Sequence, residues 1–253
     1  MFKENPAQKN AQIHKIEPKE SFLKTFFWAL LFAVFIRSFA IEPFHIPSSS
    51  MYPNLLIGDY IFVNKFSYGY SRYSFPFGFK IFEGRILKST PKRGDIIVFR
   101  LPSQPSINYV KRLIGLPGDK IQMRDGTLFI NDSEVLKVFK GDSFEIENDK
   151  KLNFQKYLET LPEGRQILTY NRANTPQDNT GIYTIPEGNY FFMGDNRDDS
   201  QDSRFLNFVG YVPEENLVGR ASTIFFSNPY SIFEFGNWVQ NIRFDRIGKT
   251  LNQ

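Results

Sequence analysis

The chain has 253 residues, and 41% of them are hydrophobic, which is enough to bury a core in one large domain or two small ones. It has no cysteine and only two histidines, so disulfides, thiol catalysis and cysteine metal sites are excluded. The net charge of +4 is spread along the chain, which argues against a nucleic-acid partner and suits the surface of an anionic membrane.

The amino-terminal region changes abruptly in character. Residues 1–21 are polar and mix lysines with glutamates, so we expect a solvated tail. Residues 22–41 are largely apolar, and their only charges, Lys24 and Arg37, lie near the ends. Twenty residues that rise ~1.5 Å each would extend ~30 Å, about the thickness of the hydrocarbon core. Composition fits a membrane anchor and a cleaved signal peptide equally well, because Ser38-Phe39-Ala40 is similar to a cleavage site. A buried core helix is a further alternative, because the uninterrupted apolar run covers only residues 25–36.

The charge distribution around this segment predicts its orientation. The tail that precedes it is rich in lysine, so the positive-inside rule leaves the amino terminus in the cytoplasm. Residues 42–253 would then lie outside.

Short runs typical of β-strands, separated by turn residues, follow the apolar segment. They predict an antiparallel, mainly β domain over residues 42–253, and Arg124-Asp125-Gly126 is typical of a hairpin turn. Residues 134–181 are weakly patterned and are interpreted as an inserted subdomain. The predicted strands cover residues 60–66, 95–101, 108–114, 120–123, 127–130, 189–193 and 217–226.

A serine cluster at residues 48–50 offers a nucleophile, although composition does not choose among the three. A serine attacks only when a nearby base removes its proton. His45 would lie ~16 Å from Ser50 in an extended segment, too far for proton transfer, and His14 is in the tail. A Ser-x-x-Lys helix is excluded because position 53 is proline. The remaining base is a lysine from another strand.

Lys111 lies in the predicted strand 108–114. Strand alternation places it on the same face as Tyr109 and Leu113. Such apolar surroundings disfavour the ammonium form and favour a neutral amine that acts as a base. A surface lysine whose stem lies along apolar neighbours would show the same pattern.

The loop 194–204 alternates aspartate and arginine with serines. It fails as a calcium site, because Arg197 occupies the third position of the loop and no glycine occupies the sixth. A solvated turn and a structural network of ion pairs beside an active site both fit this composition.

Taken together, these stretches resemble bacterial signal peptidase I in order and spacing. The resemblance covers roughly residues 22–226. It is carried by Ile46–Pro53 with Leu55–Asp59, by Lys92–Phe99, by Tyr109–Asp119 and by Gly194–Arg204.

The resemblance implies a role for each of several residues. Ser50 would be the nucleophile, Lys111 the general base, and Ser200 would orient the lysine amine. The Ser48 hydroxyl and the Ser50 backbone N–H would form the oxyanion hole. The substrate pocket, which would accept small side chains at the first and third positions before the cut, would be lined by Phe44, Ile46, Met51, Leu55, Tyr109 and Val110.

The resemblance also implies two structural ion pairs, Asp202 with Arg204 and Arg112 with Asp195. Two residues depart from the family pattern: Ser49 stands where glycine is common, and Asp199 where asparagine is common. Neither change removes a catalytic atom. The Asp199 carboxylate would raise the pKa of the lysine if it lay close to the amine.

The function that this resemblance implies is a membrane-bound serine endopeptidase that cleaves signal peptides from exported preproteins, with no metal and no cofactor. Its expected place is the inner membrane, to which a single-pass helix would attach a periplasmic catalytic domain. Its expected partners are preproteins and the phospholipid membrane, with no nucleic acid. Two other hypotheses are a catalytically inactive scaffold of the same fold and a self-cleaving repressor, although no DNA-binding domain is evident.

Overall fold

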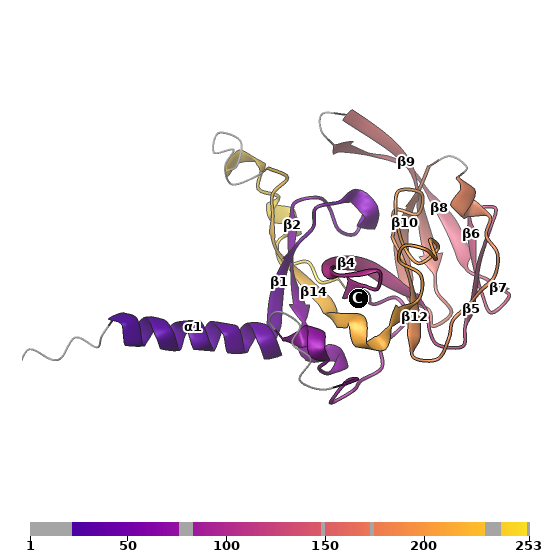
Figure 1. The fold of residues 1–253 in the computed structure, drawn as a ribbon. Coiled ribbons are helices and arrows are strands. Elements are labelled where there is room, and N and C mark those ends of the chain that lie inside the picture. Colours follow the sequence, from indigo (N-terminus) through magenta and orange to yellow (C-terminus); the bar gives the residue numbers. More distant parts are fainter. Residues whose placement is uncertain (1–21, 76–82, 148–149, 173–174, 231–238, 252–253) are drawn as a thin grey trace, which may run out of the picture.

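The computed structural model describes residues 22–75, 83–147, 150–172, 175–230 and 239–251, and confirms a mainly antiparallel β fold (Figure 1). The predicted tail 1–21 lies outside the described residues. One α-helix, α1 (Phe22–Phe39), precedes the strands in this part of the chain. The strands are β1 (Ile41–His45), β2 (Asp59–Asn64), β3 (Ile96–Leu101), β4 (Gln104–Gly115), β5 (Lys120–Arg124), β6 (Thr127–Ile130), β7 (Ser133–Glu134), β8 (Leu136–Glu147), β9 (Lys150–Thr160), β10 (Gln166–Asn171), β11 (Tyr183–Thr184), β12 (Asn189–Met193), β13 (Val212–Pro213) and β14 (Leu217–Ser227).

The largest sheet has seven strands in the order β1-β2-β14-β3-β4-β12-β13. Alternate side chains of its central strand β3 enter two different cores, as the pleat of a strand requires. Ile96 and Val98 pack in one core, and Ile97 and Phe99 pack in the other. The sheet is therefore buried on both faces near β3 and β4, where the candidate lysine lies.

A four-stranded sheet in the order β11-β5-β6-β7 packs beside the large one. The predicted hairpin is confirmed, because β5 and β6 pair as antiparallel neighbours around Asp125 and Gly126. Both turn residues have positive φ, 47° and 70°, which aspartate tolerates and glycine adopts at no cost.

The segment 134–181 contributes a three-stranded sheet in the order β10-β9-β8, on the side of the domain opposite to α1 (Figure 1). Its sequence pattern is weak because polar and apolar positions are exchanged relative to an ordinary strand pattern. Leu136 and Val138 are exposed, whereas Lys137 is half-buried and Glu159 is 1% exposed. The inner face of this sheet therefore contains charge.

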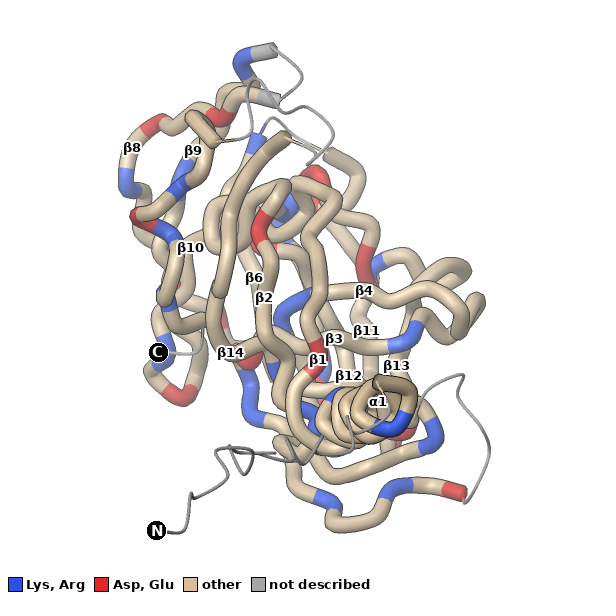
Figure 2. The backbone as a smooth tube through the Cα atoms, turned by 90° about the vertical axis from the view of Figure 1, so that its left-hand side faces the viewer, with Lys and Arg blue, Asp and Glu red and all other residues tan. Residues whose placement is uncertain are grey.

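Helix α1 projects away from the β domain and contacts it near the carboxyl end of the helix (Figure 1). The Tyr70 hydroxyl donates to the Phe39 carbonyl at 2.7 Å, and Arg37 pairs with Glu42 at 2.9 Å. The expected anchor segment extends to residue 41, whereas the helix ends at Phe39 and Ile41 pairs with Asn64 in the sheet. Figure 2 shows the helix nearly end-on, in front of that sheet.

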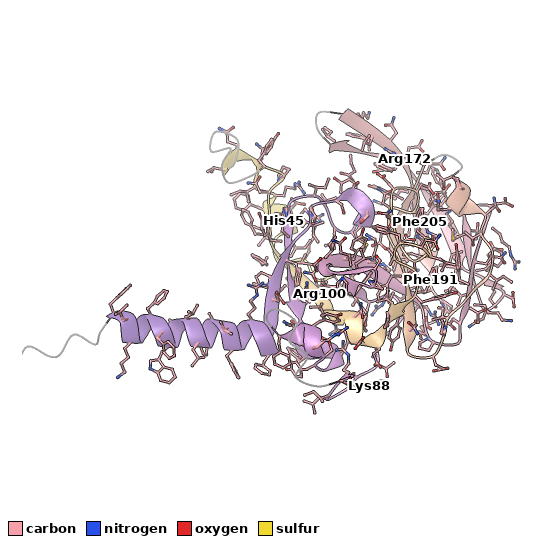
Figure 3. The ribbon with its side chains drawn as sticks, in the orientation of Figure 1. His45, Lys88, Arg100, Arg172, Phe191 and Phe205 are labelled. Carbon is pink, nitrogen blue, oxygen red and sulfur yellow. The ribbon has the colours of Figure 1, made fainter. Side chains whose placement is uncertain are left out.

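The side chains of α1 extend outward along its length, away from the rest of the domain (Figure 3). Among the described residues, no helix is long and apolar enough to cross a membrane. The large apolar side chains of α1 are nevertheless exposed: Phe22, Leu23, Phe26, Phe27, Trp28, Leu30, Leu31, Phe32, Val34, Phe35, Ile36 and Phe39.

Candidate active site

Ser50 lies in a short 3-10 turn, Ser49–Met51, that follows β1. Two contacts hold the turn in place. Met51 is buried in a core, and the Ser50 carbonyl accepts from the Asn196 N–H at 3.1 Å. Asn196 also donates its side-chain amide to the Ser49 carbonyl at 3.2 Å. Of the three neighbouring serines, Ser48 is exposed, Ser49 is half-buried and Ser50 is 8% exposed.

Lys111 approaches Ser50 from β4. Its Nζ lies 2.6 Å from the Ser50 Oγ, and it is 5.1 Å from the centre of the Tyr109 ring on the same face of the strand. The side chain is buried, with 4% exposed, and Lys111 forms no ion pair with the described residues. Of the three serines, Ser50 is the one whose hydroxyl contacts the lysine, and Lys111 does not lie on the surface.

Burial is the main reason that the pKa of Lys111 falls to about 8. The charges of Asp202 and Asp195 oppose the fall, whereas that of Arg204 favours it. A neutral amine is therefore accessible near neutral pH, which is the form that a general base requires.

Both expected ion pairs lie beside the lysine. Asp202 and Arg204 pair at 2.8 Å, and the Arg204 guanidinium lowers the pKa of Asp202 although burial acts to raise it. Arg112 donates to both carboxylate oxygens of Asp195 at 2.7 Å, a bidentate geometry that fixes both side chains. Asn54, which the sequence did not single out, donates to Asp195 at 2.7 Å.

Gly194 lets the loop 194–204 approach the nucleophile. A Cβ atom at this position would lie 2.5 Å from the Ser50 carbonyl oxygen and 2.2 Å from the Ser200 Oγ. Any larger residue would separate these elements. Gly194 and Asn196 belong to a sequence motif that does not reveal their packing roles, because those roles depend on contacts with Ser49 and Ser50, far away in the chain.

The other predicted polar residues lie around the Ser50 hydroxyl. The Ser48 Oγ is 3.3 Å from the Ser50 Oγ, a position from which it can donate to a developing oxyanion. Ser200 is buried at the site beside Asp202, and its hydroxyl forms no hydrogen bond with Lys111. Asp199 accepts from the Ser49 hydroxyl at 3.4 Å and is not among the charges that act on Lys111.

A cleft of about 710 Å³ opens in front of Ser50 and Lys111. His45, which lines it, packs its ring on that of Tyr60 with centroids 4.7 Å apart. Leu55 was expected to line the cleft but does not, and its side chain is fully buried in the same core as Met51. The expected residues that do line the cleft are Phe44, Ile46, Met51, Tyr109 and Val110, and the sequence missed Ile107, Asn108 and Phe205.

The described residues around the site do not form a metal-binding cluster. In the described ranges, no three histidine or acidic side chains gather closely enough to hold a metal ion. The chemistry that this arrangement can support is nucleophilic attack by Ser50, with Lys111 as the proton acceptor.

Comparison with known proteins gives consistent matches. The family model described as "Signal peptidase, peptidase S26" matches residues 19–226. Signal peptidase I of Rickettsia typhi is 42% identical over 247 residues, which cover 90% of this chain and 92% of that protein. Signal peptidase I of Rickettsia conorii is 41% identical, with 90% and 91% covered. A solved signal peptidase I from Enterococcus faecalis V583 is 28% identical and covers 52% of this chain and 97% of that one, with a TM-score of 0.31.

Proposed function

The chain belongs to the signal peptidase family, peptidase S26, and we propose that it is a membrane-bound endopeptidase that removes signal peptides from exported preproteins. The cut would follow a small-x-small motif. The observation that carries the proposal is the 2.6 Å approach of the Lys111 Nζ to the Ser50 Oγ.

In the proposed mechanism, the neutral Lys111 amine removes the Ser50 proton while Oγ attacks the scissile carbonyl. Ser48 and the Ser50 N–H donate to the oxyanion. The peptide C–N bond then breaks, the lysine ammonium protonates the departing amine of the mature protein, and the signal peptide remains as an ester on Ser50. Lys111 next deprotonates a water molecule, which hydrolyses the ester and restores the Ser50 hydroxyl. Ser200 would orient the amine after its side chain rotates towards it.

The buried lysine also supports this proposal over an inactive scaffold of the same fold. Burying an amine costs free energy, and an inactive scaffold would gain nothing that offsets this cost. In the described part of the chain, the Lys111 Nζ is hydrogen-bonded to the Ser50 Oγ, which is the atom that catalysis would activate.

The pH dependence of cleavage tests the proposal. Because the pKa of Lys111 is lowered to about 8 and the neutral amine is the active form, kcat/KM should rise through about pH 8 and level off above it. Asp199→Asn is the matched control and should leave this limb in place, because other carboxylates act on the lysine. A limb near pH 6.5, as for an ordinary histidine, would contradict the proposal.

Helix α1 is the proposed membrane attachment. Its exposed apolar side chains surround the helix instead of forming one stripe, and exposed apolar surfaces of this kind mark membrane or protein contacts. Lys24 and Arg37 lie near its ends, where long cationic side chains can reach the interface. Although α1 as described falls short of a complete crossing, we propose a single-pass arrangement in the inner membrane, with residues 1–21 in the cytoplasm and the catalytic domain in the periplasm.

Protease treatment of spheroplasts tests this topology. We expect added protease to digest the catalytic domain while an epitope at the amino terminus survives until the cells are lysed. Sequencing of the mature protein should find the amino terminus upstream of residue 22. A mature terminus at Ile41 would mean that the segment is a cleaved signal peptide.

A further inference from the structure

An ion pair between the inserted sheet and the loop 194–204 is completely enclosed. Arg197 Nη2 lies 2.6 Å from Glu159 Oε2, and each side chain is 1% exposed. Thr169, on the neighbouring strand β10, donates to Glu159 Oε1 at 3.2 Å. Buried ion pairs are weak sources of net stability, because removing both charges from water costs several kcal/mol. The Glu159–Arg197 pair therefore points to a role other than stability alone.

The backbone connects the same two elements. The Tyr170 N–H of β10 donates to the Asp195 carbonyl at 2.9 Å, and the Arg197 N–H donates back to the Tyr170 carbonyl at 2.8 Å. Tyr170 and Asn196 form a parallel β-bridge between them. The first residues of the loop thus extend the inserted sheet and would follow any movement of its strands.

From Arg197, a continuous set of contacts reaches the lysine. The Arg197 carbonyl accepts from Arg204 Nη2, and Arg204 pairs with Asp202 at 2.8 Å. Asp202 also accepts from the Gly194 N–H at 2.9 Å. Besides burial, the charges that act on Lys111 are those of Asp202 and Asp195, which favour the ammonium, and of Arg204, which disfavours it. The Tyr109 ring faces the amine from its own strand at 5.1 Å.

We propose that Glu159 and Arg197 are positioning residues, through which the β8-β9-β10 sheet holds the Asp202–Arg204 pair in place against the catalytic lysine. The proposal rests on the function assigned above to Lys111. It gives the inserted sheet a catalytic purpose, because the sheet supplies the carboxylate that fixes the loop.

Glu159→Gln should shift the acidic limb of kcat/KM to higher pH. The amide keeps the shape of the side chain and an acceptor for Thr169, but it leaves the Arg197 charge unpaired. If Arg197 moves, its carbonyl no longer holds Arg204 on Asp202, and a less compensated Asp202 raises the pKa of Lys111. A shift of about half a unit would lower kcat/KM about threefold at pH 7, while activity above the limb stays close to wild type. Glu159→Asp, the milder change, should shift the limb less in the same direction.

Glu163→Gln is the matched control. Glu163 lies in the turn between β9 and β10 and pairs with Arg93 at 2.9 Å, not with the loop 194–204. It should leave the limb unchanged. A purely structural effect of Glu159→Gln would lower the melting temperature without moving the limb, and that result would overturn the proposal, as would an equal shift in Glu163→Gln.

The titration of Lys111 can also be followed without substrate. In the full chain labelled with ¹³C-lysine in detergent, the Lys111 Cε signal is identified by its loss in Lys111→Met. Its pKa should rise in Glu159→Gln and stay constant in Glu163→Gln, and an unchanged value in Glu159→Gln would refute the coupling. If the pKa shifts as expected in a chain that cleaves no preprotein, the positioning role stands and the proposed peptidase function fails.

Discussion

Replacing Ser50 by alanine is expected to lower kcat/KM for preprotein cleavage by a factor on the order of 10⁴ or more, because the attacking oxygen is lost while the cleft remains. The fold should survive, since the hydroxyl contacts only Lys111 and Ser48 among the described side chains. The measurement is the cleavage rate of a purified preprotein, with the melting temperature as the test of folding.

The neighbouring serines provide graded controls for Ser50→Ala. Ser49→Ala should keep most of the activity, because the Ser49 hydroxyl contacts Asp199 instead of the lysine. Ser48→Ala should fall between them, because losing one oxyanion donor costs about 10² to 10³ in rate. An active Ser50→Ala protein, with the loss of activity moved to Ser49→Ala, would overturn the assignment of the nucleophile.

Lys111→Arg should be inactive at every pH at which the protein is folded. A guanidinium keeps its charge in proteins and cannot accept the Ser50 proton. The loss should be comparable to that of Ser50→Ala, because residues that act as a unit lose nearly all activity when either is removed. Rates measured from pH 6 to about pH 10 would show no rising limb.

Lys65 provides a matched control for this substitution. It is also buried, but it pairs with Glu42 at 3.0 Å. Burial lowers the pKa of Lys65, although the Glu42 carboxylate acts to raise it. Lys65→Arg keeps the charge that Glu42 requires and should retain activity per folded molecule. Substantial turnover by Lys111→Arg would remove the lysine from the mechanism.

The sequence predicted those parts of the fold in which local pattern and tertiary packing agree. Strand alternation placed Lys111 beside Tyr109, and the Asp125-Gly126 turn identified a hairpin. Alternation failed in the inserted sheet, where Glu159 faces inward to meet Arg197 from a distant loop. No local pattern reveals a buried charge whose partner is supplied by another part of the chain.

The candidate site was predictable to a similar extent. The motifs brought Ser50, Lys111 and the loop 194–204 to attention, and the structure places them together. Leu55, expected in the pocket, packs into the core and does not line the cleft. Asp199 was the carboxylate expected to raise the pKa of the lysine if it lay close, whereas the carboxylates whose charges act on the lysine are Asp202 and Asp195.

Incubating the full-length chain in detergent with a preprotein, and sequencing the new amino terminus, tests the central claim most directly. The assay belongs at about pH 9, where a lysine with a pKa of about 8 is mostly neutral. We expect one new terminus, directly after a small-x-small motif, with wild type and none with Ser50→Ala or Lys111→Arg. A folded wild-type protein that leaves the preprotein intact, or a Ser50→Ala protein that yields the same new terminus, would contradict the account.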